Sequence, residues 1–193
     1  NPGTAHRRER LAGLLWPESL ESTARKNLRN AVWQLRKVIG EEFLQAEKDT
    51  LAFRAEAPLA LDVAQLSNRA ALDDLDALIA AVAAYQGELL PGVYADWVQL
   101  ERERLRGLFE QRVQTLLERL AAQGRWAEVQ TWADHWIALG QVPEPAFRFL
   151  MRASAARGDL AGMALAYRRC LQTLQAELAV SPSAETQALY QQL

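Results

Sequence analysis

Most of the chain carries the spacing of apolar residues that is typical of amphipathic helices. After residue 60, apolar side chains recur every three or four positions, and alanine and leucine are abundant. The main exception is Phe43–Arg54, where two short alternating runs flank the polar residues 47–50 and predict a β-hairpin. We therefore expect a short helix at Arg7–Leu15, a turn at Pro17, a longer helix at 23–39, the hairpin, and then helices to the end.

The helical part also shows an internal repeat. Gly124 and Gly158 each interrupt a helical pattern, and they lie 34 residues apart. This is the period of the tetratricopeptide repeat, a pair of helices joined by a turn. Glycine suits such a turn because it adopts the left-handed backbone conformation that ends helices. The pattern predicts a tetratricopeptide-like α-α repeat domain over residues 61–193. Its helix faces are expected at Trp97, Leu100, Leu108, Leu116 and Leu120, and at Leu165, Tyr167 and Leu171.

The helix at 23–39 separates an apolar stripe from a basic face. At about 100° per residue, its apolar residues fall on one side, namely Ala24, Leu28, Ala31, Val32, Leu35, Val38 and Ile39. The opposite side and flanks carry the candidate DNA-binding residues, which are Arg25, Lys26, Arg29, Asn30, Trp33, Arg36 and Lys37. A short helix, a turn, a helix with a basic free face and a hairpin form the pattern of a winged helix-turn-helix over residues 1–60. Its second helix would enter the major groove of DNA, with cations on phosphates and Asn30 or an arginine on a base edge.

Charge strengthens this interpretation. The chain has a net charge of −2, but residues 1–40 hold eight Lys or Arg against three Asp or Glu, a net of +5. A basic end on an acidic body indicates an anionic partner for that end. The alternative is that the basic face is only solvated. No acidic residue lies between Ala24 and Gly40 to form i,i+4 pairs, which argues against this. The hairpin tip, Glu47-Lys48-Asp49, is acidic on balance, which is unfavourable for a minor-groove contact.

Trp33 stands in the middle of the basic face. An exposed tryptophan requires a partner more than an exposed lysine does. Trp33 could contact nucleic acid, or it could pack against the helical body and fix how the two parts sit. The second option is favoured, because tryptophan is not a usual reader of bases.

Several segments resemble a known family of regulators. Arg8–Pro17, Ala24–Arg29 and Gln34–Lys37 look like the DNA-binding half of the Streptomyces antibiotic regulatory protein family. Tyr85–Arg106 and Leu178–Thr186 look like its bacterial transcriptional activation domain. The resemblance implies direct-repeat promoter sites and recruitment of RNA polymerase. It also implies an opening sheet and helix ahead of this region, so we expect a partial winged helix.

No catalytic set, cofactor motif or metal-ligand spacing is recognisable in the sequence. His6, His135 and the single cysteine, Cys170, stand apart, and there is no CxxC, phosphate loop or dinucleotide fingerprint. We expect no enzymatic activity, no cofactor and no bound metal. One thiol and no apolar run of about 20 residues favour the cytoplasm and argue against a membrane.

Two functions remain open. The first is a transcription regulator that binds double-stranded promoter DNA through the basic helix. Its repeats would contact RNA polymerase or a second copy of the chain. The second is a protein-interaction scaffold, in which the repeat groove binds a peptide or partner helix and the basic helix docks on the acidic body.

Overall fold

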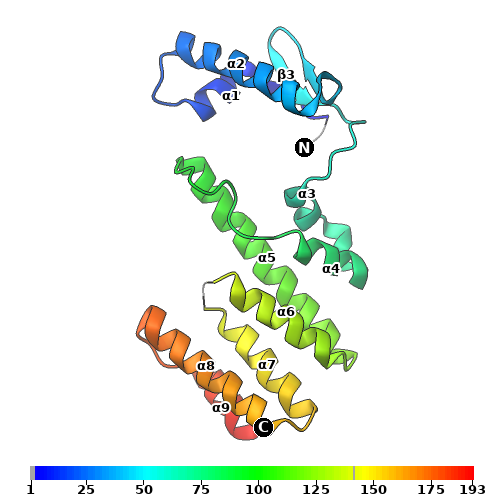
Figure 1. Ribbon diagram of the computed structural model, residues 1–193, viewed down its shortest axis with the longest axis vertical. Coiled ribbons are helices and arrows are strands. Elements are labelled where there is room, and N and C mark those ends of the chain that lie inside the picture. The colour runs from blue at the N-terminus through cyan, green and yellow to red at the C-terminus, as the bar shows by residue number, and fades with distance from the viewer. Residues whose placement is uncertain (1–2, 141) are drawn as a thin grey trace. The chain divides into compact units, whose positions relative to one another are not determined.

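The computed structural model describes residues 3–140 and 142–193. They are mainly helical, with one small antiparallel sheet, and form two compact units, Asn1–Ala64 and Gln65–Leu193 (Figure 1). The predicted fold class, a winged helix followed by helical repeats, is confirmed. The described elements of the first unit, up to the short helix at the boundary, are β1 (His6–Arg7), α1 (Arg8–Leu15), α2 (Glu21–Ile39), a 3-10 turn (Glu41–Phe43), β2 (Leu44–Ala46), β3 (Thr50–Phe53) and α3 (Asp62–Ser67).

A small apolar core holds α1 and α2 together. Ala12 of α1 packs against Ala24, Leu28 and Val32 of α2, and these four side chains are at most 7% exposed. The predicted stripe of α2 is therefore buried only in part. Leu35 and Val38 at its C-terminal end are 37% and 82% exposed. The reason is that α1 has only eight residues, and the core that it forms with α2 extends no further than Val32.

The predicted hairpin is present, and it belongs to a three-stranded sheet. β2 and β3 pair antiparallel, with Leu44 opposite Phe53. β1 pairs with the other edge of β3 and places Arg7 opposite Thr50, so the strand order is β1-β3-β2. Strand β1 was not predicted, because two residues show no alternation. Its pairing brings the start of α1 next to the hairpin tip.

The second unit is a stack of antiparallel helices. Helices α6, α7 and α8 lie side by side, and α9 closes the stack against α7 and α8 (Figure 1). Gly124 joins α5 to α6 with φ 68°, and Gly158 joins α7 to α8 with φ 73°. The two glycines therefore make the left-handed turns that their 34-residue spacing predicted. The elements of this unit after α3 are a 3-10 turn (Arg69–Leu72), α4 (Leu75–Ala83), α5 (Asp96–Ala122), α6 (Trp126–Ala138), α7 (Glu144–Ala156), α8 (Leu160–Leu178) and α9 (Ala184–Gln192).

The buried face of α8 differs from the expected one. Leu165 and Leu171 are 51% and 44% exposed, and on α5 Leu100 is 68% exposed. The buried side of α8 is formed by Met163, Ala166, Cys170 and Leu174. Leucines occur on both faces of α8, so spacing alone could not decide which face packs on α7.

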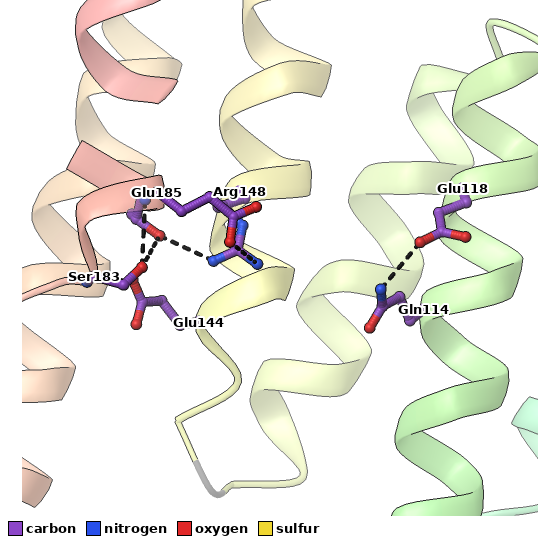
Figure 2. A network of polar contacts seen from close by, with 7 residues as sticks. Gln114, Glu118, Glu144, Arg148, Ser183 and Glu185 are labelled. Atoms are coloured by element: carbon purple, nitrogen blue, oxygen red, sulfur yellow. Dashed lines mark hydrogen bonds and ion pairs between the residues drawn. The ribbon is translucent and has the colours of Figure 1, made fainter. Parts of the chain in front are cut away.

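Polar contacts attach α9 to the start of α7. Glu144 accepts hydrogen bonds from the backbone N and the Oγ of Ser183, both at 2.7 Å (Figure 2). Arg148 lies 3.2 Å from Glu185 and donates to Thr186 Oγ1 at 3.1 Å. Burial acts to raise the pKa of Glu144. The bonds from Thr186 and Ser183 and the charge of Arg148 outweigh it and hold the pKa below its ordinary value of 4.5.

Ser183→Ala is expected to destabilise the second unit by about 1 kcal/mol at pH 7, because it removes a helix cap and one bond to Glu144. The lowered pKa of Glu144 contributes stability above pH 4.5, and this is lost as the pH falls through the folded-state pKa. The difference in free energy of unfolding between the variant and the parent should therefore become smaller below pH 4.5. Urea unfolding at pH 7 and below pH 4.5 measures this difference. Ser181→Ala, an exposed neighbour, is the matched control, and an equal loss in both variants would contradict the assignment.

Arg112 of α5 is buried without a charged partner. It is 2% exposed, and its Nη2 donates to the carbonyl of Asn68 at 2.9 Å. Its Nε and Nη1 are buried and have no hydrogen-bond partner among the described residues. Burial lowers the pKa of Arg112, and the charge of Arg69 lowers it further. A single hydrogen bond therefore offsets little of the desolvation cost of this buried guanidinium charge.

Arg112→Met is expected to raise the free energy of unfolding by about 1–2 kcal/mol, because it removes two unpaired donors and a buried charge while keeping the length of the side chain. Chemical denaturation measures the change. Arg168→Met, at an exposed position of α8, is the control and should stay within about 0.5 kcal/mol. A loss of stability in Arg112→Met would mean that the bond to Asn68 outweighs the cost of burial.

Candidate nucleic-acid interface

Helix α2 positions most of the candidate residues. It begins at Glu21, two residues before the predicted start, and Leu20 precedes it without a side-chain cap. It ends at Gly40, whose φ of 101° favours glycine. Six of the seven candidate residues are exposed, and Arg36 is half-buried. The Nε of Arg36 is buried and has no hydrogen-bond partner in the described part of the chain.

Arg25 is not a free cation. Its Nη2 donates to Glu9 at 2.7 Å and to Glu21, the residue four positions earlier on α2, at 2.5 Å. The argument that α2 lacks acidic i,i+4 partners is therefore wrong at this position. It failed because the helix starts earlier than the sequence pattern indicated and so includes Glu21. Arg25 is about half exposed, and its two acidic partners are exposed more.

Trp33 has a partner on its own helix. It is 54% exposed, and the Nζ of Lys37 lies 3.6 Å from the centre of its ring. Such a cation–π contact at an exposed site contributes about 0.5–1 kcal/mol. Lys26 and Asn30 are exposed on the same outward side. Packing of Trp33 against the helical body stays a prediction.

A groove of about 690 Å³ runs between α1, α2 and the hairpin tip. Arg25, Leu28 and Arg29 of α2 form one wall of it. In its lining, cations outnumber acids five to two. The charged lining residues are Arg7, Arg8, Arg25, Arg29 and Lys48, with Glu9 and Asp49.

Backbone geometry brings these cations together from separate elements. The pairing of β1 with β3 places Arg7 beside Thr50, at the end of the hairpin tip. The backbone N of Arg8 donates to the carbonyl of Asp49 at 2.9 Å, and its Nε donates to the carbonyl of Glu47 at 3.0 Å. The start of α1 is thus fixed to the tip, and both face α2 across the groove.

Three of the groove cations, Arg7, Arg8 and Lys48, were missed from the sequence. The hairpin tip was considered acidic, but the carboxylate of Glu47 accepts hydrogen bonds from the side chains of Gln45 and Thr50 and does not line the groove. Lys48 and Arg29 have no ion-pair partner among the described residues. The adjacent Arg7-Arg8 pair was the only available signal, since convergence of the three elements requires the sheet.

This arrangement of cations is suited to binding a polyanion such as the sugar-phosphate backbone of a nucleic acid. Arginine and lysine side chains on phosphates supply most of the affinity for nucleic acid and carry no sequence information. The outward side of α2 adds Lys26 and Asn30, and Asn is a reader of adenine edges. The described residues contain no group of three or more His, Cys, Asp or Glu side chains that could hold a metal ion. None of the described helices combines the length and apolar character that crossing a membrane requires.

Comparisons with known proteins match this chain to a family model, a curated relative and a solved structure. Residues 48–193 match the model of the bacterial transcriptional activator domain. The regulatory protein AfsR of Streptomyces coelicolor is 30% identical over 194 residues, which cover 95% of this chain and 20% of AfsR. The chain thus spans about a fifth of the length of this relative. A structure of Mycobacterium tuberculosis EmbR in complex with a low-affinity phosphopeptide shares the fold, with a TM-score of 0.64 at 21% identity, covering 100% of this chain and 55% of EmbR.

Proposed function

The chain belongs to the bacterial transcriptional activator domain family, and from this premise we propose that it regulates transcription by binding promoter DNA through α2 and the groove beside it. The family comprises transcription regulators rather than enzymes. The observation that supports DNA binding most is the convergence of cations from β1, α1, α2 and the hairpin tip on one groove. In this proposal the protein acts in the cytoplasm.

The residues divide the recognition of DNA between them. Arg7, Arg8, Arg29 and Lys48 bind phosphates of one backbone strand along the groove. Lys26 and Asn30, on the outward side of α2, face base edges in the major groove. Arg25 binds a phosphate only in competition with Glu9 and Glu21, and it contributes less for that reason.

The helical repeat unit contacts a protein, either RNA polymerase or a second copy of the chain. Exposed apolar side chains near the start of α5 support this part of the proposal. Tyr94 is 81% exposed and Leu100 is 68% exposed, with Leu90 and Val93 nearby in the chain. Several large apolar side chains exposed within one short segment make it a candidate protein contact site.

Binding of the full-length gene product to a labelled duplex from its own upstream region tests the proposal. Log K should fall linearly with log salt at about −0.9 per phosphate contact, so about four contacts predict a slope near −3.6. Trp33 emission should change when DNA is added, with Trp33→Phe as the control for the other tryptophans. Binding that is absent at low salt, with unchanged Trp33 emission, would favour the scaffold function instead.

A further inference from the structure

The helical unit contains a second pocket, far smaller than the groove and independent of it. It measures about 190 Å³, the volume of roughly six water molecules. Its wall comes from the loop after α4, from α5 and from the end of α6. Pockets for drug-sized ligands usually measure about 300–1,000 Å³, so this one is suited to a ligand of amino-acid size.

The floor of the pocket is aromatic and rigid. The ring of Tyr85 stacks on Phe109 with centroids 4.5 Å apart and an interplanar angle of 20°. Phe109 is 2% exposed, and Trp136, which also lines the pocket, is 5% exposed. A side chain buried to this degree keeps its position, so Phe109 holds the half-buried Tyr85 in place as the surface that an entering apolar group meets.

The loop wall is fixed by one arginine of α5. Arg102 donates from Nε to the carbonyl of Leu89 at 2.7 Å and from Nη2 to the carbonyl of Leu90 at 2.6 Å. Its side chain is only 11% exposed, and Nη2 lies 3.6 Å from Glu88. The loop is therefore held in place as one wall of the pocket, to which it contributes Gly87 and Glu88. At two other lining positions, Gly87 and Gly140, an added Cβ would meet nothing within 4 Å, so the mouth is open there.

Two opposite charges in the pocket are unpaired. Arg106 and Glu110 lie one turn apart on α5, beside Phe109, and both line the pocket. Neither forms a hydrogen bond or ion pair through its side chain with any described residue, whereas Glu88 faces Arg102. Burial raises the pKa of Tyr85, Arg106 opposes this, and Glu110 and Glu88 add to it. The phenol thus stays protonated and able to donate at neutral pH.

We propose that this pocket binds a small zwitterion with a large apolar group, the chemical class of the apolar α-amino acids. The apolar group packs against Tyr85, which is half-buried and supported from below by the buried Phe109. The carboxylate pairs with Arg106, and the ammonium group pairs with Glu110. Each charge of the protein then pairs with the opposite charge of the ligand. Hydrogen bonds between charged groups are stronger than those between neutral groups, which favours binding. Such a ligand would act as an effector on the unit that contacts protein.

Calorimetric titration of the full chain with L-phenylalanine and L-leucine tests this proposal. We expect saturable binding of at least one of them. Phenethylamine, which lacks the carboxylate, and 3-phenylpropionate, which lacks the ammonium group, should each bind at least tenfold more weakly. N-acetylphenylalanine amide, which has neither charge, resembles a side chain within a polypeptide. Equal binding of this amide would assign the pocket to a partner protein and overturn the proposal, as would no binding of either amino acid at millimolar concentration.

Two variants separate the charges. Arg106→Gln should weaken binding of L-phenylalanine about tenfold or more and leave phenethylamine unaffected. Glu110→Gln should weaken L-phenylalanine similarly and leave 3-phenylpropionate unaffected. Arg119→Gln, on the same helix but outside the pocket, is the matched control and should bind as the parent does. Equal affinity in all three variants would refute the roles of both charges, and circular dichroism verifies that each variant is folded. Because no groove residue is changed, these results are independent of DNA binding.

Discussion

Reversing the charges of Arg29 and Lys48 together is expected to weaken binding of duplex DNA by roughly 50- to 100-fold at 0.1 M salt. Each phosphate contact contributes about 0.9 to the dependence of log K on log salt, which corresponds to a factor of about eight between 1 M and 0.1 M. Two lost contacts give about 60-fold, and reversal adds repulsion. The slope should become shallower by about 2. Fluorescence anisotropy over a salt series measures both quantities.

Arg29 and Lys48 lie on different elements of the groove, so their double reversal tests the groove and not only α2. Arg29 lies on α2 and Lys48 on the hairpin tip, and both line the groove without an ion-pair partner among the described residues. Both are exposed, so their replacement should leave the core of the unit intact. Reversing Arg29 alone or Lys48 alone tests the two walls of the groove separately. Each single reversal should change the slope of log K against log salt by about half as much as the double reversal does.

Arg10→Glu with Arg54→Glu is the matched control. Both arginines are exposed in the same unit, outside the groove lining, and their reversal changes the net charge by the same amount. Long-range attraction alone would make the two double variants equivalent, and that outcome would contradict a role for the groove. We expect the control to retain the parental slope, because a slope counts contacts rather than net charge.

The ion pairs of Arg25 with Glu9 and Glu21 limit how much Arg25 contributes to DNA affinity. An arginine held by two carboxylates must give up both bonds before it can bind a phosphate. Arg25 therefore contributes less to affinity than Arg29 does, although the two lie on the same wall of the groove. The difference should be small, because exposed ion pairs contribute about 0–1 kcal/mol and are screened by salt.

The elements of this fold could be predicted where the chain itself dictates them. Gly40 ends α2, and Gly124 and Gly158 make the turns of the repeats, because each has a positive φ that glycine adopts without strain. Ser183 caps α9 by accepting from the backbone N of Thr186, three positions later in the chain. Such features depend on a few neighbouring residues, so a single sequence carries them.

The candidate site could be predicted only in part, because it depends on contacts between distant segments. Arg25 and Arg29 were found because they lie on one helix. Arg8 and Lys48 are 40 residues apart, and only the pairing of β1 with β3 brings them into one groove. The exposure of Val38 was also missed, since spacing marks an apolar face but cannot say how far along α2 the packing of α1 extends.

Phe147→Ala is expected to destabilise the helical unit by about 3–5 kcal/mol, the cost of leaving a cavity in a close-packed core. Phe147 is 1% exposed on α7, and α7 packs against both α6 and α8 (Figure 1). Each of the two units has its own buried core. The loss should therefore appear as faster hydrogen exchange in α6, α7 and α8 and leave the protection of α2 unchanged. Mass spectrometry of peptides after exchange resolves the two units.

Leu165→Ala removes about half as many carbon atoms, from a side chain of α8 that is 51% exposed, and it should cost no more than about 0.5 kcal/mol. This contrast tests which face of α8 is buried, the point on which the leucine pattern was misleading. A large cost at Leu165 would mean that another molecule or segment covers that face in solution. If Phe147→Ala also speeds hydrogen exchange in α2, the two cores unfold as one cooperative structure. A ligand of the helical unit would then affect DNA binding through that cooperativity.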